Sequence, residues 1–487
     1  MKKKFNRIRL ILTGTGILIL TGISSCALKE TAETDKPNFI IIFTDDQGYG
    51  DLGCYGSPNI ATPHIDKFAG EGMRFTSFYA APYCGPSRAQ LMTGSYPART
   101  GHAQNTSPSS TNGLDPEEIT IAEILKENSY ATMCIGKWHL GHAPGYLPTN
   151  QGFDHFFGTP YSNDMWRYHP RMRPQENEDS LMQAIRKRAA YTGYHGEESY
   201  YPTDGGFPND LPLMVDERII ERNPDQRQLT TRYTESAIEF IQAKKDEPFF
   251  LFLAYNMPHV PLFVSGKFDG ASPRGLYGDV MMEIDWSVGE ILATLTALGL
   301  DDKTMVVFTS DNGPWLQYGI DGGSAGPLRA GKGTLYEGGV RVPALVRWPG
   351  KIPAGKISSA ITGNHDLLPT LAELAGASIP SDRTIDGRSL WPLLSGENTK
   401  TPHDFFHYMG GSPKGKVNYH GIRDERWKLM VNVNREGKVI ANELYDLGAD
   451  VGEKFNRIED HPDIADKLKI EAQLFYNEIS ENIRNTK

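Results

Sequence analysis

Four continuous runs of apolar residues in this chain each end in a short polar cluster. The runs span residues 39–44, 130–135, 249–255 and 304–309, and amphipathic segments cover 117–128, 230–244 and 279–298. Apolar runs of this length are typical of strands buried on both faces of a parallel sheet. Strands that alternate with helices predict an α/β domain whose large, mostly parallel or mixed sheet is flanked by helices.

The polar clusters that follow the runs contain residue types that carry out chemistry: Asp45, Asp46, Lys137, His139, His259, Asp311 and Asn312. In open α/β sheets, ligands bind beyond the carboxyl ends of the strands. One such cluster alone is more often a solvated strand end. Four of them predict one shared site.

The acidic members of these clusters indicate a metal. Asp45, Asp46, Asp311 and Asn312 offer only hard oxygen ligands. Three carboxylates at one sheet edge repel each other unless a cation neutralises them. Oxygen ligation favours Ca²⁺ or Mg²⁺ over zinc or copper.

Lys332 adds a further cation within the Gly-rich segment 328–333. This segment either folds closely around an oxyanion or forms a flexible surface loop, and its spacing is not that of a Walker loop. A divalent cation, lysines and histidines together suit a tetrahedral oxyanion ester, either sulfate or phosphate.

A reactive residue is predicted at the start of a helix over residues 84–93. Pro86 suits the first helical turn and Gly94 suits the end. The N-terminus of a helix attracts anions and lowers the pKa of a thiol, so we expect a reactive Cys84 with a depressed pKa. The alternative is an ordinary helix with a buried thiol.

The chain divides into a catalytic domain over 38–396 and a smaller α+β C-terminal domain over 397–487. The latter is predicted from a hairpin over 421–431, a strand at 443–447 and a helix over 461–484, which indicate an antiparallel sheet. Residues 164–228 are rich in charge, Gly, Pro and Tyr, and are predicted to form an irregular insertion with some helix near 179–190. Its tyrosines suit either sugar recognition or simple packing.

The N-terminus has the pattern of a bacterial lipoprotein signal peptide. A basic start and an apolar stretch lead to a cleavage box, which predicts a signal peptide over 1–25, lipidation of Cys26 and a tether over 26–37. A plain secretory signal is the alternative. We therefore expect an exported protein that is lipid-anchored in a bacterial envelope, in the periplasm or at the cell surface.

The net charge bears on the class of partner, and two cysteines remain to be assigned. The net charge of −10 argues against a nucleic-acid partner. Cys54 and Cys134 could pair in an oxidising compartment, but free buried thiols are the preferred interpretation.

Several motifs resemble the type I sulfatase family. The stretch Cys84-Gly85-Pro86-Ser87-Arg88 resembles that family's C-x-P-S-R modification signature, and residues 136–141 (GKWHLG) resemble its second signature. Ser129 stands where the second signature usually has Gly, which we expect to affect only a turn. Segments 158–164 and 274–285 are similar to the arylsulfatase A and N-acetylgalactosamine-6-sulfatase branch. The resemblance extends from Pro37 to the C-terminal domain.

The resemblance implies an alkaline phosphatase superfamily fold and a set of residue roles. A maturase would oxidise Cys84 to formylglycine, whose hydrated aldehyde attacks sulfur and forms a covalent sulfo-enzyme. The implied calcium ligands are Asp45, Asp46, Cys84, Asp311 and Asn312. Arg88 would steady the formylglycine, and the implied sulfate contacts are Lys137, Lys332 and Ser162. His259 would protonate the leaving alcohol, and His139 would help to eliminate sulfate.

The predicted function is therefore hydrolysis of sulfate esters on carbohydrate of the glycosaminoglycan, mucin or algal type, with galacto-configured sugars favoured by the branch resemblance. One alternative is a phosphonate or phosphodiester hydrolase on the same scaffold. The other is an unmodified, non-catalytic glycan-binding lipoprotein.

Overall fold

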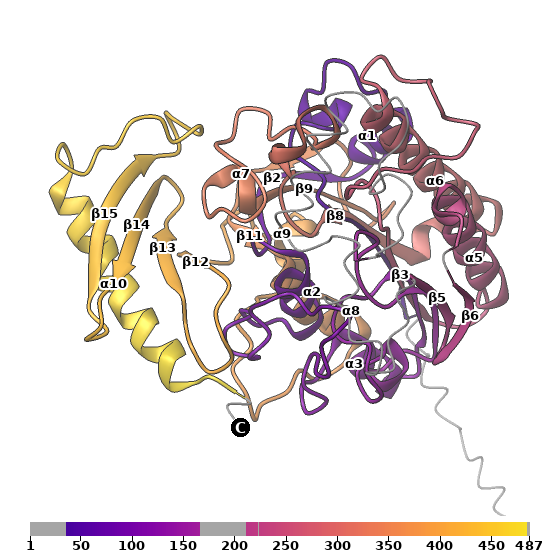
Figure 1. Ribbon diagram of the computed structural model, residues 1–487, viewed down its shortest axis with the longest axis horizontal. Helices are drawn as coiled ribbons and strands as arrows, with labels where there is room; N and C mark the ends of the chain where they lie inside the picture. The colour runs from indigo at the N-terminus through magenta and orange to yellow at the C-terminus, as the bar shows by residue number, and fades with distance from the viewer. Residues whose placement is uncertain (1–35, 166–210, 223, 485–487) are drawn as a thin grey trace, which may run out of the picture. The chain divides into compact units, whose positions relative to one another are not determined.

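The computed structural model describes residues 36–165, 211–222 and 224–484, and the structural statements below refer to these residues (Figure 1). The predicted signal peptide, Cys26, nearly all of the tether and the helix near 179–190 lie outside them. No helix within the described ranges has the length and apolar character needed to cross a membrane.

A large mixed sheet forms the centre of the first domain. Its strands follow the order β10 (Lys356–Ser358), β2 (Met73–Tyr79), β9 (Arg341–Arg347), β8 (Thr304–Ser310), β1 (Asn38–Thr44), β7 (Phe249–Ala254), β3 (Ala131–Lys137), β4 (His155–Thr159), β5 (Pro212–Val215) and β6 (Arg218–Arg222), with β11 (Thr362–Gly363) paired to β2. The five strands from β8 to β4 are parallel to one another, whereas β9 runs antiparallel to both β2 and β8. The four predicted strands are β1, β3, β7 and β8, and they are direct neighbours whose carboxyl ends share one edge.

Helices cover both faces of this sheet because alternate residues of its central strands point to opposite sides. Phe39, Ile41 and Phe43 of β1 pack into a core with α2 (Cys84–Thr93), α3 (Ile121–Glu127) and α8 (Leu367–Ala375). Ile40 and Ile42 pack into a second core with α1 (Pro63–Gly70), α5 (Leu229–Ala243) and α6 (Leu276–Ala297). The short helices are η1 (Gly53–Tyr55), η2 (Pro148–Asn150), η4 (Gln226–Gln228), η5 (Asp301–Lys303), η6 (Leu316–Asp321), α7 (Glu337–Val340), η7 (Asn364–Asp366) and α9 (Trp391–Leu394).

A second, antiparallel sheet follows near the C-terminus, drawn in yellow in Figure 1. It consists of β12 (Phe406–Met409), β13 (Tyr419–Arg423), β14 (Trp427–Val433) and β15 (Val439–Asp446), and α10 (Pro462–Glu481) packs against it. Asp424 closes the β13–β14 hairpin: its backbone N–H donates to the carbonyl of Trp427 at 3.0 Å. The predicted fold class is confirmed.

A buried ionic network joins the two sheets around Glu337 of α7. The Glu337 carboxylate accepts hydrogen bonds from the hydroxyls of Tyr79 (2.6 Å) and Tyr408 (2.8 Å) and from Lys428 Nζ (3.0 Å). Lys428 also pairs with Glu453 at 2.8 Å. Burial alone would raise the pKa of Glu337, but Lys428, Arg341 and Arg423 outweigh it and lower that pKa. Removing one partner would leave a buried charge unpaired, which is costly. The network therefore holds Glu337, and with it the chain between Lys332 and α7, in one position.

Three local features differ from the sequence analysis or refine it. The segment predicted as helical over 117–128 forms a shorter helix, because Thr120 and Glu123 make a capping box that begins α3 at Ile121. The described end of the predicted irregular insertion is the hairpin β5–β6. Ser129 has a φ of 65°, in the left-handed region, which is why Gly suits that turn.

Candidate active site

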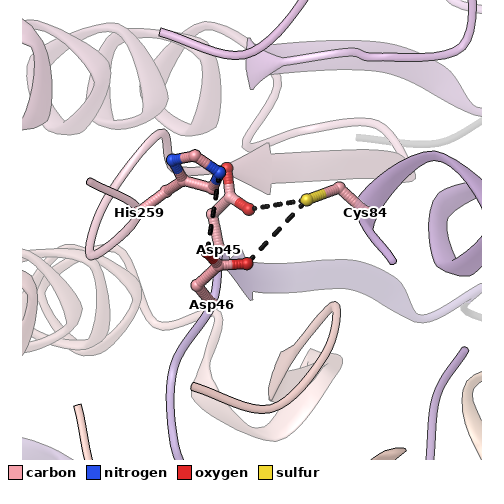
Figure 2. Close-up of side chains that lie close together, drawn as sticks. All are labelled: Asp45, Asp46, Cys84 and His259. Carbon is pink, nitrogen blue, oxygen red and sulfur yellow. Dashed lines mark hydrogen bonds and ion pairs between the residues drawn. The ribbon is translucent and has the colours of Figure 1, made fainter. Parts of the chain in front are cut away.

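The polar clusters meet at the carboxyl edge of the parallel strands, as the sequence predicts. Asp45 and Asp46 directly follow β1, and Lys137 ends β3. His259 follows β7, and Asp311 and Asn312 follow β8. The helix α2 begins at Cys84 and directs the thiol toward the two aspartates, opposite His259 (Figure 2).

Cys84 lies at the centre of these contacts. Its thiol donates to Asp45 Oδ1 at 3.3 Å and to Asp46 Oδ1 at 3.9 Å, and it accepts from Lys332 Nζ at 3.4 Å. The residue is 1% exposed. The helix ends as predicted, because Gly94 adopts a φ of 65° and its N–H donates to the Gln90 carbonyl.

The expectation of a depressed Cys84 pKa is wrong. Burial, followed by the nearby carboxylates of Asp311 and Asp45, raises the pKa of the Cys84 thiol well above its usual value. The favourable helix N-terminus acts only over about one turn, and two buried anions outweigh it. The unmodified residue is therefore a protonated thiol and a weak nucleophile.

The other two described cysteines take no part in this cluster. Cys134 is buried in β3 and Cys54 is half-buried in η1, and both are free thiols. The sequence leaves open a Cys54–Cys134 disulfide or two free thiols, and the structure has the free thiols.

Two buried lysines connect the acidic residues to the rest of the site. Lys137 Nζ forms an ion pair with Asp45 Oδ2 and donates to Ser162 Oγ at 3.2 Å. Lys332 Nζ lies 2.7 Å from Asp46 Oδ1. Burial would lower the pKa of each ammonium, but Asp45 raises that of Lys137 and Asp46 raises that of Lys332. Both side chains are therefore positively charged at neutral pH.

Backbone hydrogen bonds hold the segment that carries Lys332 against its neighbours, which favours the closely folded alternative over the flexible loop. The N–H of Lys332 donates to the carbonyl of Pro314 at 2.9 Å, and the N–H of Gly333 donates to that of Pro82 at 3.0 Å. Gly338 closes the segment through a 2.8 Å bond from its N–H to the Arg329 carbonyl.

Arg88 and Asp311 form a fully buried ion pair beneath the site. Arg88 Nη2 lies 3.1 Å from Asp311 Oδ2, and Arg88 Nη1 donates to the Lys137 carbonyl. Asp311 Oδ1 accepts the N–H of Asp46 at 3.1 Å. Burial and the neighbouring Asp45 raise the pKa of Asp311 to about 7. Arg88 thus supports the strand ends from below.

The carboxylate and amide oxygens at the site could hold a divalent cation. Ligand atoms of Asp45, Asp46, Cys84 and His259 lie within 4.8 Å of one another. Asn312 donates through Nδ2 to Asp46 at 2.7 Å, while its buried Oδ1 has no hydrogen-bond partner among the described residues. A buried amide oxygen that lacks a partner and lies next to the Asp46 carboxylate can serve as a further ligand to a divalent cation. Asp311 is not in the tight group, because its two oxygens accept from Asp46 and Arg88.

The hydrogen bonds of the two histidines fix which nitrogen of each faces the site. His259 Nδ1 donates to the Val260 carbonyl, so Nε2 faces Asp46 Oδ2 at 3.5 Å. His139 Nε2 donates to the Thr106 carbonyl at 3.0 Å. Its Nδ1 is buried and has no hydrogen-bond partner in the described part of the chain. Burial, then Lys137 and Arg88, lower the pKa of His139 well below its usual value, so this ring is neutral and Nδ1 is a proton acceptor.

Two site residues have strained backbones. Asp46 has a φ of 62° and His139 a φ of 60°, in a region that non-glycine residues seldom occupy. Such strain costs about 1–3 kcal/mol each and persists where surrounding contacts impose it. Here the contacts come from Asp311, Asn312 and Lys332 for Asp46, and from Thr106 for His139.

The sequence analysis missed three residues at this site. Asn105 Oδ1 accepts the N–H of Gly85 at 2.8 Å, and the carbonyl of Thr106 orients His139. Trp315 packs against His259 and Lys332. A signal existed only for Trp315, which lies three residues after Asn312. The other two act from a loop that has no recognisable pattern.

A polar cavity of about 250 Å³ lies beside the site, between the 100–115 loop and the segment at 412–414. Its walls include His102, Asn105, Thr106, Tyr146 and Lys414. Because Asn105 and Thr106 also support Cys84 and His139, the cavity shares a wall with the reactive groups.

The burial of His102 should make the free energy of unfolding depend on pH. Burial lowers its pKa to about 4, below the 6.5 of an unfolded histidine. The stability contribution of the neutral ring is therefore complete above pH 6.5 and is lost as the pH falls toward 4. We expect the free energy of unfolding of the wild type to fall about 3 kcal/mol more than that of His102→Gln between pH 7 and pH 4. Urea unfolding at both pH values measures this difference, and parallel changes in the two proteins would contradict it.

Comparison with known proteins assigns the family. Residues 37–377 match the family model described as Sulfatase, and residues 330–478 match the one described as N-sulphoglucosamine sulphohydrolase, C-terminal. Arylsulfatase A of Homo sapiens is 39% identical over 446 residues, which cover 86% of this chain and 83% of that protein. N-acetylgalactosamine-6-sulfatase of Canis lupus familiaris is 39% identical over 413 residues, covering 82% and 74%. The crystal structure of Ps i-CgsB in complex with k-i-k-neocarrahexaose is similar with a TM-score of 0.75 at 31% identity, covering 93% and 94%. The chain therefore belongs to the sulfatase family and is a sulfuric ester hydrolase.

Proposed function

We propose that this sulfatase hydrolyses sulfate esters on carbohydrate, with galacto-configured sugars preferred, and that it uses formylglycine at position 84 and Ca²⁺. One observation carries the proposal: Cys84 lies between two carboxylates and a lysine, yet its own thiol is held protonated. A residue placed for nucleophilic attack but unfit for it as cysteine is what a modified nucleophile would require.

The carbohydrate assignment rests on similarity and on the surroundings of the site. Relatives named N-acetylgalactosamine-6-sulfatase and a solved neighbour bound to neocarrahexaose are both similar over most of this chain. The adjacent cavity offers hydrogen-bonding side chains such as Asn105, Tyr146 and Lys414, which suit sugar hydroxyls.

The protein's own cations would bind the sulfate group. Lys137 lies at the end of β3 and pairs with Asp45, and Lys332 contacts Cys84 from the loop between η6 and α7. Both remain charged, so they can hold non-bridging sulfate oxygens and stabilise charge that develops there. Ser162, bonded to Lys137, adds a hydroxyl donor on the same side.

The two histidines would divide the proton transfers. His259 presents Nε2 to the site, and a proton held there beside Asp46 can pass to the leaving oxygen. His139 has Nε2 bonded to Thr106, so its Nδ1 can accept a proton from the nucleophile side. One histidine therefore acts as an acid and the other as a base.

The proposal assigns residues of this chain to formylglycine and to Ca²⁺. Formylglycine at position 84 would supply a hydrated-aldehyde oxygen as the nucleophile. Asp45, Asp46, Asn312 and residue 84, with Asp311, would hold Ca²⁺, which neutralises the carboxylates. Arg88 orients this set through Asp311 and the Lys137 carbonyl.

We also propose export and lipid anchoring at Cys26, supported by the basic and apolar pattern of the first 26 residues. Export would bring the enzyme to polysaccharide outside the cytoplasm. A maturase that oxidises Cys84 is then a required partner.

The function is tested by sulfate release from defined sulfated mono- and disaccharides. The full chain is co-produced with a formylglycine-generating maturase and assayed with galactose 6-sulfate, N-acetylgalactosamine 6-sulfate, their gluco-configured counterparts and matched phosphate esters. We expect sulfate release, fastest from the galacto-configured sugars. Faster turnover of the phosphate esters would reject the sulfatase assignment, and faster release from gluco-configured sugars would reject the sugar preference.

Calcium should stabilise the folded chain through Asn312. At about 100 times its dissociation constant, a bound ion adds about 2.7 kcal/mol to the free energy of unfolding. We expect Ca²⁺ to raise the melting temperature of chelator-treated wild type, and Asn312→Ala to reduce this increase strongly. Asn38→Ala is the matched control, because Asn38 begins β1 at the opposite edge of the sheet. An equal response of both variants would contradict the proposed site.

A further inference from the structure

Trp315 is an aromatic side chain at the edge of the reactive cluster. It follows the Asp311-Asn312-Gly313-Pro314 segment, and its side chain is half-buried. Its ring centroid lies 5.5 Å from that of His259 at an interplanar angle of 64°, and Lys332 Nζ lies 4.5 Å from the centroid. The indole therefore contacts the proposed proton donor and one proposed sulfate-binding cation at once.

The indole is held in a fixed position. Tyr318 packs edge-on against it with centroids 4.7 Å apart. The backbone before Trp315 is tied to the Lys332 segment, since the N–H of Lys332 donates to the Pro314 carbonyl at 2.9 Å. The carbonyl of Trp315 itself accepts the N–H of Tyr318 at 3.1 Å, which closes a turn around the indole. A partly exposed ring with so little freedom loses little entropy when a ligand packs on it.

The chemistry of the ester places its sugar next to this ring. In the proposed roles, His259 protonates the bridging oxygen and Lys332 contacts the non-bridging sulfate oxygens. The carbon that carries the sulfate would therefore lie beside both side chains, and the partly exposed indole contacts both of them. Galacto-configured pyranoses have one face made of C–H groups, and an aromatic ring binds such an apolar face while hydroxyls remain in polar surroundings.

We infer that Trp315 is the platform on which the sugar ring of the substrate packs, and that it makes the enzyme favour pyranose sulfates over sulfate alone. This inference rests on the proposed carbohydrate sulfatase function. It assigns Trp315 to substrate binding, because the ring lies against the sugar and takes no part in proton transfer.

The test compares two ligands in full-length Cys84→Ala protein, which binds without turnover. Dissociation constants for galactose 6-sulfate and for inorganic sulfate are measured by calorimetry with Trp315, Trp315→Phe and Trp315→Ala. We expect Trp315→Ala to raise the dissociation constant of galactose 6-sulfate about 10-fold and that of inorganic sulfate less than about 3-fold. Trp315→Phe should recover most of the lost affinity for galactose 6-sulfate. Melting curves verify that each variant is folded.

Trp286 provides the matched control. Trp286 lies on α6 and is also half-buried beneath a lysine, with Lys267 Nζ 4.5 Å from its ring centroid. It contacts Phe268, which precedes α6, and Glu290 on the same helix. Trp286→Ala should change neither constant. If Trp315→Ala weakens the binding of both ligands equally, Trp315 only positions Lys332 and the inference is overturned. Unchanged binding of both ligands would also overturn it. If the parent protein itself binds no galactose 6-sulfate, the carbohydrate assignment fails and the inference fails with it.

Discussion

Replacement of Cys84 by alanine should lower sulfate release at least about 10⁴-fold and leave the protein folded. The side chain is buried at the start of α2 and contacts Asp45, Asp46 and Lys332, so its loss removes the proposed nucleophile and one proposed metal ligand. The change removes only the group on the Cβ atom of one residue in a polar site, and the apolar cores on the two faces of the sheet stay intact. Steady-state sulfate release and thermal melting measure the two effects separately.

Cys134→Ala is the matched control for this experiment. Cys134 is equally buried, but it lies within β3 and packs in the apolar core. Its truncation should cost about 1 kcal/mol of stability and leave the catalytic rate within about twofold. Peptide mass spectrometry across Cys84 completes the test: substantial sulfate release by protein with only unmodified thiol at position 84 would contradict the formylglycine proposal.

The central strands were predictable because they are buried on both faces. A parallel strand in such a position needs apolar residues throughout, and β1, β3, β7 and β8 therefore appear as continuous apolar runs. Their polar successors meet because parallel neighbours end at the same edge. This reasoning requires no knowledge of long-range contacts, which explains its success.

The strands at the sheet's flanks gave no comparable pattern. β9 contains Pro343, which argues against a central strand because it lacks an N–H. The structure accommodates it where the β2–β9 register shifts: Phe75 pairs with Ala344 and Phe78 with Val342, so Pro343 lies at the irregularity. β6 is largely exposed and charged, and its pairing with β5 depends on tertiary context.

The chemistry of the site divides in the same way. Residue types and strand ends were sufficient to predict that Lys137, the aspartates and the histidines lie close together, whereas Lys332 comes from a loop. The ionisation of Cys84 was not predictable, because the helix N-terminus is a local feature, whereas the thiol pKa is raised by burial in the folded chain and then by Asp311 and Asp45, which follow β8 and β1. The orientation of His139 likewise depends on the carbonyl of Thr106, and a backbone atom has no sequence signature.

His259→Ala should reduce hydrolysis of a sugar sulfate about 10³-fold while affecting an aryl sulfate far less. A sugar alkoxide is a poor leaving group and needs a proton as the bond to sulfur breaks, a contribution typically of 10²–10⁴-fold. A 4-nitrophenolate leaves readily without one. His259 is suited to this role because its Nδ1 donates to Val260, which leaves Nε2 to hold the proton that is transferred, beside Asp46 at 3.5 Å.

The ratio of the two losses distinguishes proton donation from simple positioning. Catalytic rates of the wild type and of His259→Ala are measured on galactose 6-sulfate and on 4-nitrophenyl sulfate, with His155→Ala on β4 as a control that should keep both rates. A general acid requires the loss on the sugar ester to exceed the loss on the aryl ester by at least about 30-fold. Equal losses would mean that His259 binds or orients the sulfate group itself, and the proton for the leaving alcohol would then have to come from another donor, such as the ammonium of Lys137 or Lys332.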